Sequence, residues 1–287
     1  MLMPSIDRLA TVHLFHPVRR MFAASRQPGI PILMYHSISE EPATANHPYF
    51  LTNSCPRVFA EHMRFLHENG YETVSLTETI RCLKAGQTSP KSVVLTFDDG
   101  YDDFYTNAYP VMSLYGFNAT VFLPTDYIGN EPRSFNNKRC LTWNQVRELH
   151  RAGVTFGSHT VTHPQLRSVA QRDLAYEVRH SKETLENELD SKIESFCYPY
   201  AFPEHDVRFR LALRSQLEES GYKHGVCTIL GVARKGDDTF FLKRLPVNSC
   251  DDYRFLRAKL EGGYDWLHRF QYAAKWAKGR LKWNHSN

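Results

Sequence analysis

The 287-residue sequence lacks any apolar run of the roughly 20 residues that a membrane-spanning helix needs. Near the N-terminus, the apolar stretch from Leu9 to Phe22 is too interrupted to resemble a secretory signal peptide. We therefore expect a location in the cytoplasm, or at the periphery of the inner face of the membrane. The interrupting residues are His13, His16, Pro17, Arg19 and Arg20.

Closely spaced cysteine pairs are also missing. None of the six cysteines forms a CxxC motif, which argues against a metal site built from thiolates. Because secretion is not expected, we predict that the cysteines are reduced and mostly buried. They are Cys55, Cys82, Cys140, Cys197, Cys227 and Cys250.

The chain has little excess of charge of one sign, with a formal net charge of +4. Residues 1–28 carry four Arg and one Asp, and residues 253–287 carry eight Lys or Arg and two acidic residues. These segments contribute +3 and +6, so residues 29–252 carry 4 − 3 − 6 = −5. A mildly acidic central part argues against a nucleic-acid-binding core.

Short apolar runs alternate with amphipathic stretches, which is typical of repeated βα units. No repeat, low-complexity linker or domain boundary interrupts this alternation before about residue 250. We therefore predict a basic N-terminal segment (1–28), one barrel-like α/β domain (29–250) and a basic, helical C-terminal tail (251–287). The expected strands are Ile30–Tyr35, Glu72–Ser75, Ser92–Phe97, Ala119–Leu123, Val154–Gly157, Ser195–Tyr198, Tyr222–Thr228 and Phe240–Val247. The expected helices are Pro56–Glu68 (with Ser54 as its cap), Leu76–Leu83, Asp102–Leu114, Trp143–Arg151 (capped by Thr142), Arg172–Leu189 and Asp206–Ser220.

Polar residues follow several of these strands at the point where each strand ends. Asp98 and Asp99 follow the strand Ser92–Phe97, His36 follows the first strand, and His159 follows the fifth. The carboxyl ends of parallel strands in such folds lie at one edge, where functional groups gather. We therefore expect these side chains to meet at one rim. The polar loop from Gly129 to Arg139 could overhang it.

Asp99, His159 and His163 predict a site with two His and one carboxylate and an open position, which suits a catalytic zinc or similar divalent ion. The two histidines are four residues apart and can point the same way on a helical turn. Asp98 diverges from its neighbour Asp99, so it is free to act as a general base. The alternatives are that the acids cap a helix and that the histidines have capping or surface roles.

These motifs resemble the polysaccharide deacetylases of carbohydrate esterase family 4. The resemblance rests on Thr96–Gly100 and His159–Pro164, and it extends from about Pro31 to Val247. Its further segments resemble the subgroup that contains bacterial poly-N-acetylglucosamine deacetylases. They are Leu33–His36, Ala119–Leu123, Leu141–Trp143, Phe196–Tyr200 and Arg244–Val247.

The resemblance implies a distorted (β/α) barrel of about seven strands and a metal-dependent hydrolase that removes N-acetyl groups from sugars. It implies that Asp98 is the general base, that Asp99, His159 and His163 bind zinc (or cobalt or nickel), and that the backbone near Tyr200 stabilises the oxyanion. An acetylated amino-sugar polysaccharide or lipid-linked glycan is the implied partner.

The chain departs from the family's usual motifs at three positions. Tyr198 stands near the place of an Arg that usually steadies the base, so Tyr198 remains a candidate at the substrate or oxyanion position. Arg244 could replace that Arg, or it could be a surface strand residue. The usual late Leu-x-His acid is absent, which favours His36 in Tyr35-His36 as the general acid. Ala201 replaces a usual Gly.

Three other readings remain open from the sequence. The same site could serve an O-acetyl esterase or a sugar deformylase, or the chain could be a catalytically silent carbohydrate-binding protein. The C-terminal tail carries Trp276 and Trp283 among basic residues, which fits either a helix packed on the barrel or a contact with an anionic membrane surface.

Overall fold

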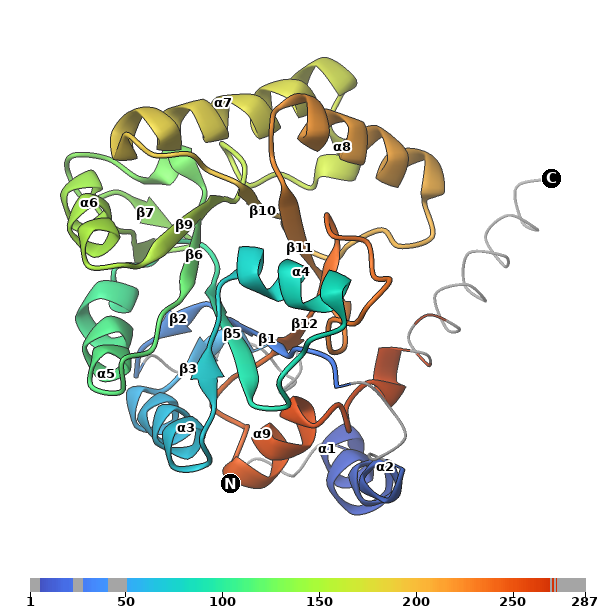
Figure 1. Ribbon diagram of the computed structural model, residues 1–287. Helices are drawn as coiled ribbons and strands as arrows, with labels where there is room; N and C mark the ends of the chain where they lie inside the picture. Colours follow the sequence, from blue (N-terminus) through green and yellow to red (C-terminus); the bar gives the residue numbers. More distant parts are fainter. Residues whose placement is uncertain (1–5, 23–27, 41–50, 269, 271, 273–287) are drawn as a thin grey trace.

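The computed structural model describes residues 6–22, 28–40, 51–268, 270 and 272. Seven parallel strands form a closed ring in the order β1, β12, β11, β10, β9, β6, β5, and β5 pairs back onto β1. The ring explains the chain's near-continuous apolar runs, because both faces of each strand are buried. The expected distorted (β/α) barrel of about seven strands is confirmed (Figure 1). These strands are β1 (Ile32–Tyr35), β5 (Ser92–Phe97), β6 (Thr120–Leu123), β9 (Thr155–Ser158), β10 (Ser195–Cys197), β11 (His224–Leu230) and β12 (Leu242–Pro246).

Short strands lie outside the ring. β4 (Glu72–Thr73) pairs with β5 and extends the sheet by one strand. The pairs β2 (Ser37–Ile38) with β3 (Asn53–Ser54), and β7 (Ser134–Phe135) with β8 (Lys138–Arg139), were not predicted, because two-residue strands are too short to show a hydrophobic period.

Helices surround the ring between the strands (Figure 1). The predicted helices all occur, with bounds that shift by at most two residues. One predicted cap is wrong: Cys55, not Ser54, is the N-cap of α3. The helices are α3 (Pro56–Glu68), α4 (Leu76–Ala85), η4 (Phe104–Ala108) continuing into α5 (Tyr109–Ser113), α6 (Trp143–Arg151), α7 (Gln171–Leu189) and α8 (Val207–Glu219), with short 3-10 turns η5 (Thr125–Tyr127) and η6 (Leu166–Ser168).

Alternate residues of each strand face opposite sides of the barrel wall. On β5, Val93 and Leu95 join the outer core beneath the helices, whereas Val94 joins a separate inner cluster. Helix α4 adds Leu76 and Ile80 to that inner cluster, so it covers one end of the barrel. Figure 1 looks onto this covered end. The strands run from it to the opposite, carboxyl-terminal rim.

The two terminal segments pack against each other. The N-terminal helix consists of α1 (Ile6–Ala10), the π-helical turn η1 (Thr11–Phe15) and α2 (His16–Met21), and it lies beside α9 (Tyr253–Leu260). This helix was not predicted from the sequence. The helical C-terminal tail occurs at α9, whereas residues 273–287, with Trp276 and Trp283, lie outside the described residues. The division at residues 28 and 250 remains a prediction.

Candidate active site

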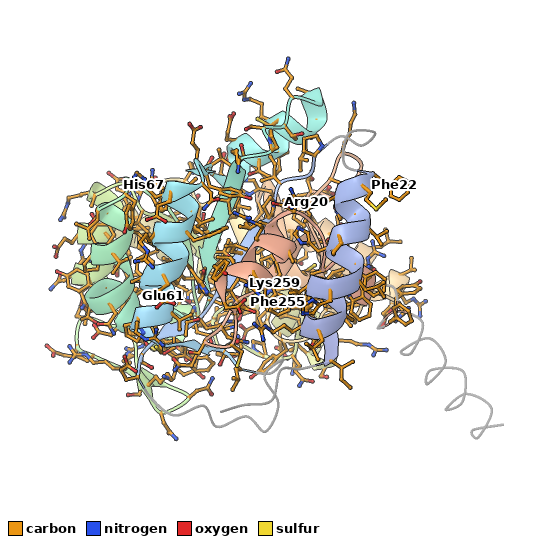
Figure 2. The ribbon with its side chains drawn as sticks, turned by 90° about the horizontal axis from the view of Figure 1, so that it is seen from below. Arg20, Phe22, Glu61, His67, Phe255 and Lys259 are labelled. Carbon is orange, nitrogen blue, oxygen red and sulfur yellow. The ribbon has the colours of Figure 1, made fainter. Side chains whose placement is uncertain are left out.

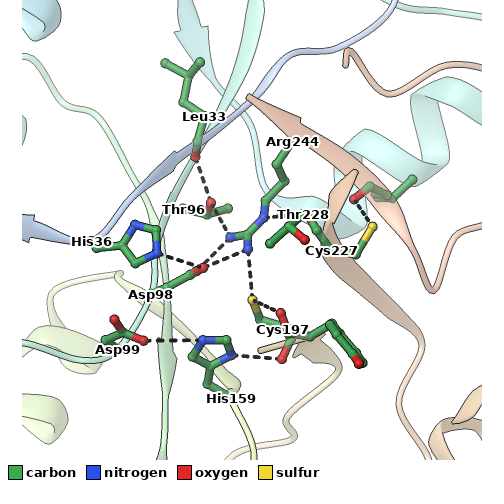
Figure 3. Close-up of polar contacts among 12 residues, drawn as sticks. Leu33, His36, Thr96, Asp98, Asp99, His159, Cys197, Cys227, Thr228 and Arg244 are labelled. Atoms are coloured by element: carbon green, nitrogen blue, oxygen red, sulfur yellow. Dashed lines mark hydrogen bonds and ion pairs between the residues drawn. The ribbon is translucent and has the colours of Figure 1, made fainter. Parts of the chain in front are cut away.

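Asp98 lies at the carboxyl end of β5. It continues the set of alternate residues, Val94 and Thr96, that face the inside of the barrel. The side chain is 3% exposed. Both of its oxygens accept hydrogen bonds from Arg244 of β12, each at 2.7 Å (Figure 3). A bidentate pair of this kind fixes the carboxylate's orientation as well as its charge.

Arg244 is 0% exposed and fills the centre of the barrel behind Asp98. Its Nε donates to the backbone oxygen of Cys227 at 3.1 Å, and one terminal nitrogen donates to Thr96 Oγ1 at 3.2 Å. The other terminal nitrogen lies 3.1 Å from Cys197 Sγ. The alternative of a surface strand Arg is therefore wrong, and every side of the buried guanidinium is paired.

The charge of Arg244 decides the protonation state of Asp98. Burial alone would raise the pKa of this carboxyl, but the charge and hydrogen bonds of Arg244 outweigh burial and hold the pKa far below its ordinary value. Asp98 is thus ionised near neutral pH.

The ligand atoms of Asp99, His159 and His163 form one group next to Asp98. The two His Nε2 atoms are 3.1 Å apart, and Asp99 Oδ1 lies 3.5 Å from that of His159 and 3.4 Å from that of His163. A tetrahedral ion with ligand bonds of about 2.0–2.1 Å separates neighbouring ligand atoms by about 3.3 Å. The three atoms therefore fit one small divalent cation.

The tautomer of His159 suits a ligand. Its Nδ1 lies 2.9 Å from the backbone oxygen of Cys197, which can only accept, so Nδ1 carries a proton and Nε2 is the nitrogen that faces Asp99 and His163. Burial and the charge of His159 lower the pKa of His163 to about 4. His163 is therefore neutral near pH 7, as a metal ligand must be.

A second group of atoms, from Asp98, His159 and Cys197, is also close enough to surround an ion. It is the poorer candidate, because Arg244 already occupies both oxygens of Asp98. Burial also raises the pKa of the Cys197 thiol, which disfavours the thiolate that binds metals.

The loop that carries the histidines is held in an unusual conformation. Thr160 and His163 of this loop have positive φ, at 71° and 56°. Asp99, which follows β5, also has positive φ, at 72°. Glu177 of α7 compensates by accepting hydrogen bonds from the backbone nitrogens of Val161 and Thr162. Positive φ at residues other than glycine costs free energy and concentrates at functional sites.

His36 and Tyr200 border the same place. His36 Nε2 lies 3.9 Å from Asp98 Oδ2, with a side chain 17% exposed. The ring of Tyr200 is 49% exposed and its centroid lies 4.7 Å from that of His163. The predicted polar loop does lie over this rim, since Phe135 of β7 packs 4.9 Å from the His163 ring.

Tyr198 does not join the site. Its ring is 2% exposed and packs against Phe202 and Phe209 in the outer core. The expectation of a substrate or oxyanion contact for this side chain is therefore corrected. The alternation of the strand explains the difference, because Cys197 faces inward and its neighbour must face outward.

Three residues that position the site were not predicted from the sequence. Thr96 contacts Arg244, the Cys197 oxygen holds His159, and Glu177 holds the histidine loop. The buried position of Glu177 could have been predicted from the sequence. It is three residues after Leu174 and precedes Val178, so it falls on the apolar face of its helix. An acid on that face needs a buried partner. Thr96 and Cys197 gave no signal of their own.

Known proteins share this arrangement of strands and sequence motifs. The profile of the family described as polysaccharide deacetylase matches residues 85–221. The Bacillus subtilis protein named putative polysaccharide deacetylase YxkH is 33% identical over 223 residues, which cover 76% of this chain and 71% of that protein. The chain belongs to the polysaccharide deacetylase family.

Two further proteins extend the likeness of this deacetylase. The poly-beta-1,6-N-acetyl-D-glucosamine N-deacetylase of Staphylococcus aureus is 21% identical over 250 residues, which cover 81% of this chain and 83% of that protein. The solved structure of Streptococcus pyogenes deacetylase PplD in complex with acetate is 26% identical, with a TM-score of 0.70 over 82% of this chain and 99% of that one. The chain is thus a hydrolytic enzyme, and its likeness extends to the poly-N-acetylglucosamine deacetylase subgroup.

Proposed function

We propose that this deacetylase removes acetyl groups from the nitrogen of an acetylated amino-sugar glycan, with Asp98 as general base and His36 as general acid. The single observation that supports this most is the position of Asp98. Its carboxylate lies 3.9 Å from His36 Nε2, it directly precedes Asp99 of the group formed with His159 and His163, and Arg244 holds it ionised.

Asp99, His159 and His163 would hold a divalent ion, and zinc suits two imidazoles and one carboxylate best, with cobalt or nickel as substitutes. When bound, such an ion polarises the acetyl carbonyl and lowers the pKa of water. The remaining chemistry belongs to the chain's own residues.

Asp98 accepts the proton of the attacking water. Arg244 makes Asp98 a weak but permanently ionised base, and it prevents the carboxylate from turning away. Water whose pKa has been lowered gives up its proton to a weak base. The low pKa of Asp98 is therefore compatible with its role as general base. The backbone N–H of Tyr200 would donate to the oxyanion that forms on the acetyl oxygen.

His36 donates the proton that the leaving amine needs. An amine anion is a very poor leaving group, so cleavage of an amide requires this proton, whereas an ester with an acidic alcohol does not. The side chain of His36 is partly exposed, and its Nε2 lies 3.9 Å from Asp98 Oδ2. It is thus placed to reach the nitrogen of a bound acetamide.

The substrate class can be tested with a panel of acetylated glycans. We expect β-1,6-linked N-acetylglucosamine oligomers to yield acetate and free amines in equal amounts, measured by an acetate assay and by mass spectrometry. Acetate released only from O-acetylated glycans, with no free amine, would favour the esterase. Formate released from a formylated sugar would favour the deformylase, and no product at all would favour the silent binding protein.

A further inference from the structure

The N-terminal helix, residues 6–22, has two different faces. Its inner face packs on the barrel and α9: Thr11 is fully buried and accepts a hydrogen bond from Trp266 Nε1 at 2.9 Å, and the Phe15 ring stacks on that of Trp266 at 4.4 Å. His16 Nε2 lies 2.7 Å from Glu261. These contacts fix which side of the helix faces outward.

The outer face is apolar over its whole length. Its exposed large side chains are 44% to 85% exposed, and the π-helical turn η1 adds one residue to the turn, which brings Leu14 onto the same side as Leu9 and Val18. Six such residues along one side of a helix form a continuous patch, whereas exposed apolar side chains on a protein surface are normally scattered. They are Ile6, Leu9, Leu14, Val18, Met21 and Phe22.

The charges around this face are basic or neutralised. The exposed polar residues between its apolar side chains are His13 and Arg20, and Arg20 also lies 3.8 Å from Glu261. The helix's one acid, Asp7, turns inward to accept a hydrogen bond from the Tyr264 hydroxyl at 2.6 Å.

The acids of the adjoining segment are paired with bases as well. Asp252 pairs with Arg8, and Glu261 pairs with His16. Asp265 pairs with Arg234 at 2.9 Å. Among the described residues, the acids of this helix and of residues 252–265 therefore all have a partner, which limits their repulsion of a negatively charged surface.

We propose that the outer face of residues 6–22 docks on the surface of an anionic lipid bilayer. A helix with one apolar face and basic flanks lies in the plane of a bilayer interface, with its apolar side chains among the acyl chains. Figure 2 shows Phe22 at the outer edge of this helix, away from α9 with its Phe255 and Lys259. Anionic headgroups complement the +3 charge of residues 1–28 and the +6 charge of residues 253–287.

A second copy of the chain suits this face less well. A two-fold interface would place the same basic flank of both copies together, and like charges at an interface cost free energy. The proposal does not depend on the glycan or the chemistry assigned above, so either can fail without the other.

The test is sedimentation of the full chain with vesicles. We expect binding to vesicles of equal phosphatidylcholine and phosphatidylglycerol, weaker binding to pure phosphatidylcholine, and a decrease as salt is raised. The double variant Leu14→Glu, Met21→Glu should weaken binding by about tenfold or more, because both side chains are exposed and their charges would enter the acyl region.

The matched control is Leu114→Glu, Leu211→Glu, which changes two comparably exposed leucines, one just after α5 and one on α8, and should leave binding unchanged. Thermal melts of both variants check the fold. Three results would overturn the proposal: no binding by the wild type, equal binding by L14E/M21E, or a wild-type dimer in analytical ultracentrifugation that L14E/M21E converts to monomer.

Discussion

Replacing Asp98 by Asn should lower kcat for acetate release by about a thousandfold, with a much smaller change in KM. Asn has nearly the same shape and can still accept a hydrogen bond from Arg244, but it cannot take a proton from water. The zinc content of the purified variant should stay at the wild-type level, because Asp99, His159 and His163 are unchanged.

The same substitution should also destabilise the fold. It leaves Arg244, which is 0% exposed, facing a neutral partner, and breaking a buried ion pair costs about 3–5 kcal/mol. We expect a loss toward the lower end of that range, measured by urea unfolding, since Thr96, Cys197 and the Cys227 oxygen still contact the guanidinium.

Asp190→Asn is the matched control. Asp190 is exposed at the end of α7 with φ of 48°, a conformation that Asn tolerates as well as Asp does. This variant should keep wild-type kcat and stability. If Asp98→Asn retained full deacetylase activity, Asp98 would not be the general base.

Replacing His36 by Gln should separate two kinds of substrate. Release of acetate from an N-acetylated sugar should fall by about a hundredfold or more, because the amine then leaves without a positioned proton donor. Hydrolysis of an aryl acetate should fall little, because a phenolate leaves without protonation. The ratio of the two rates is thus the readout of general acid catalysis.

The ratio distinguishes a proton donor from a structural residue. If His36 only shaped the site, both substrates would lose activity to the same extent. The control variant is His180→Gln on the exposed side of α7, where the imidazole only stacks on Tyr176. Equal losses on both substrates in His36→Gln would move the general acid to another group.

The barrel strands and the polar groups at the barrel's carboxyl-terminal rim could be predicted from the sequence. Strands buried on both faces read as apolar runs, so β5 was located at its observed bounds, and the residues that follow it had to lie at the carboxyl edge. His159 and His163 were placed near Asp99 by the same reasoning, and their ligand atoms meet within 4.8 Å.

The partners of these groups were harder to predict, because they come from distant strands. The sequence could not decide whether Arg244 faced outward or inward, since that depends on the register of β12 in a ring closed by tertiary packing. The direction of Tyr198 depended on the same register. The N-terminal helix was missed because its exposed side is apolar and its buried side includes Thr11 and His16, the reverse of the usual pattern of a surface helix.

The central proposal is that hydrolysis needs a divalent ion held by Asp99, His159 and His163. The direct test is acetate release from β-1,6-linked N-acetylglucosamine oligomers by the full chain before chelation, after removal of the metal, and after return of one equivalent of zinc. We predict loss of activity on chelation and its recovery with zinc, and no recovery in the variant His159→Ala. Undiminished acetate release from protein shown to be free of metal would contradict the account.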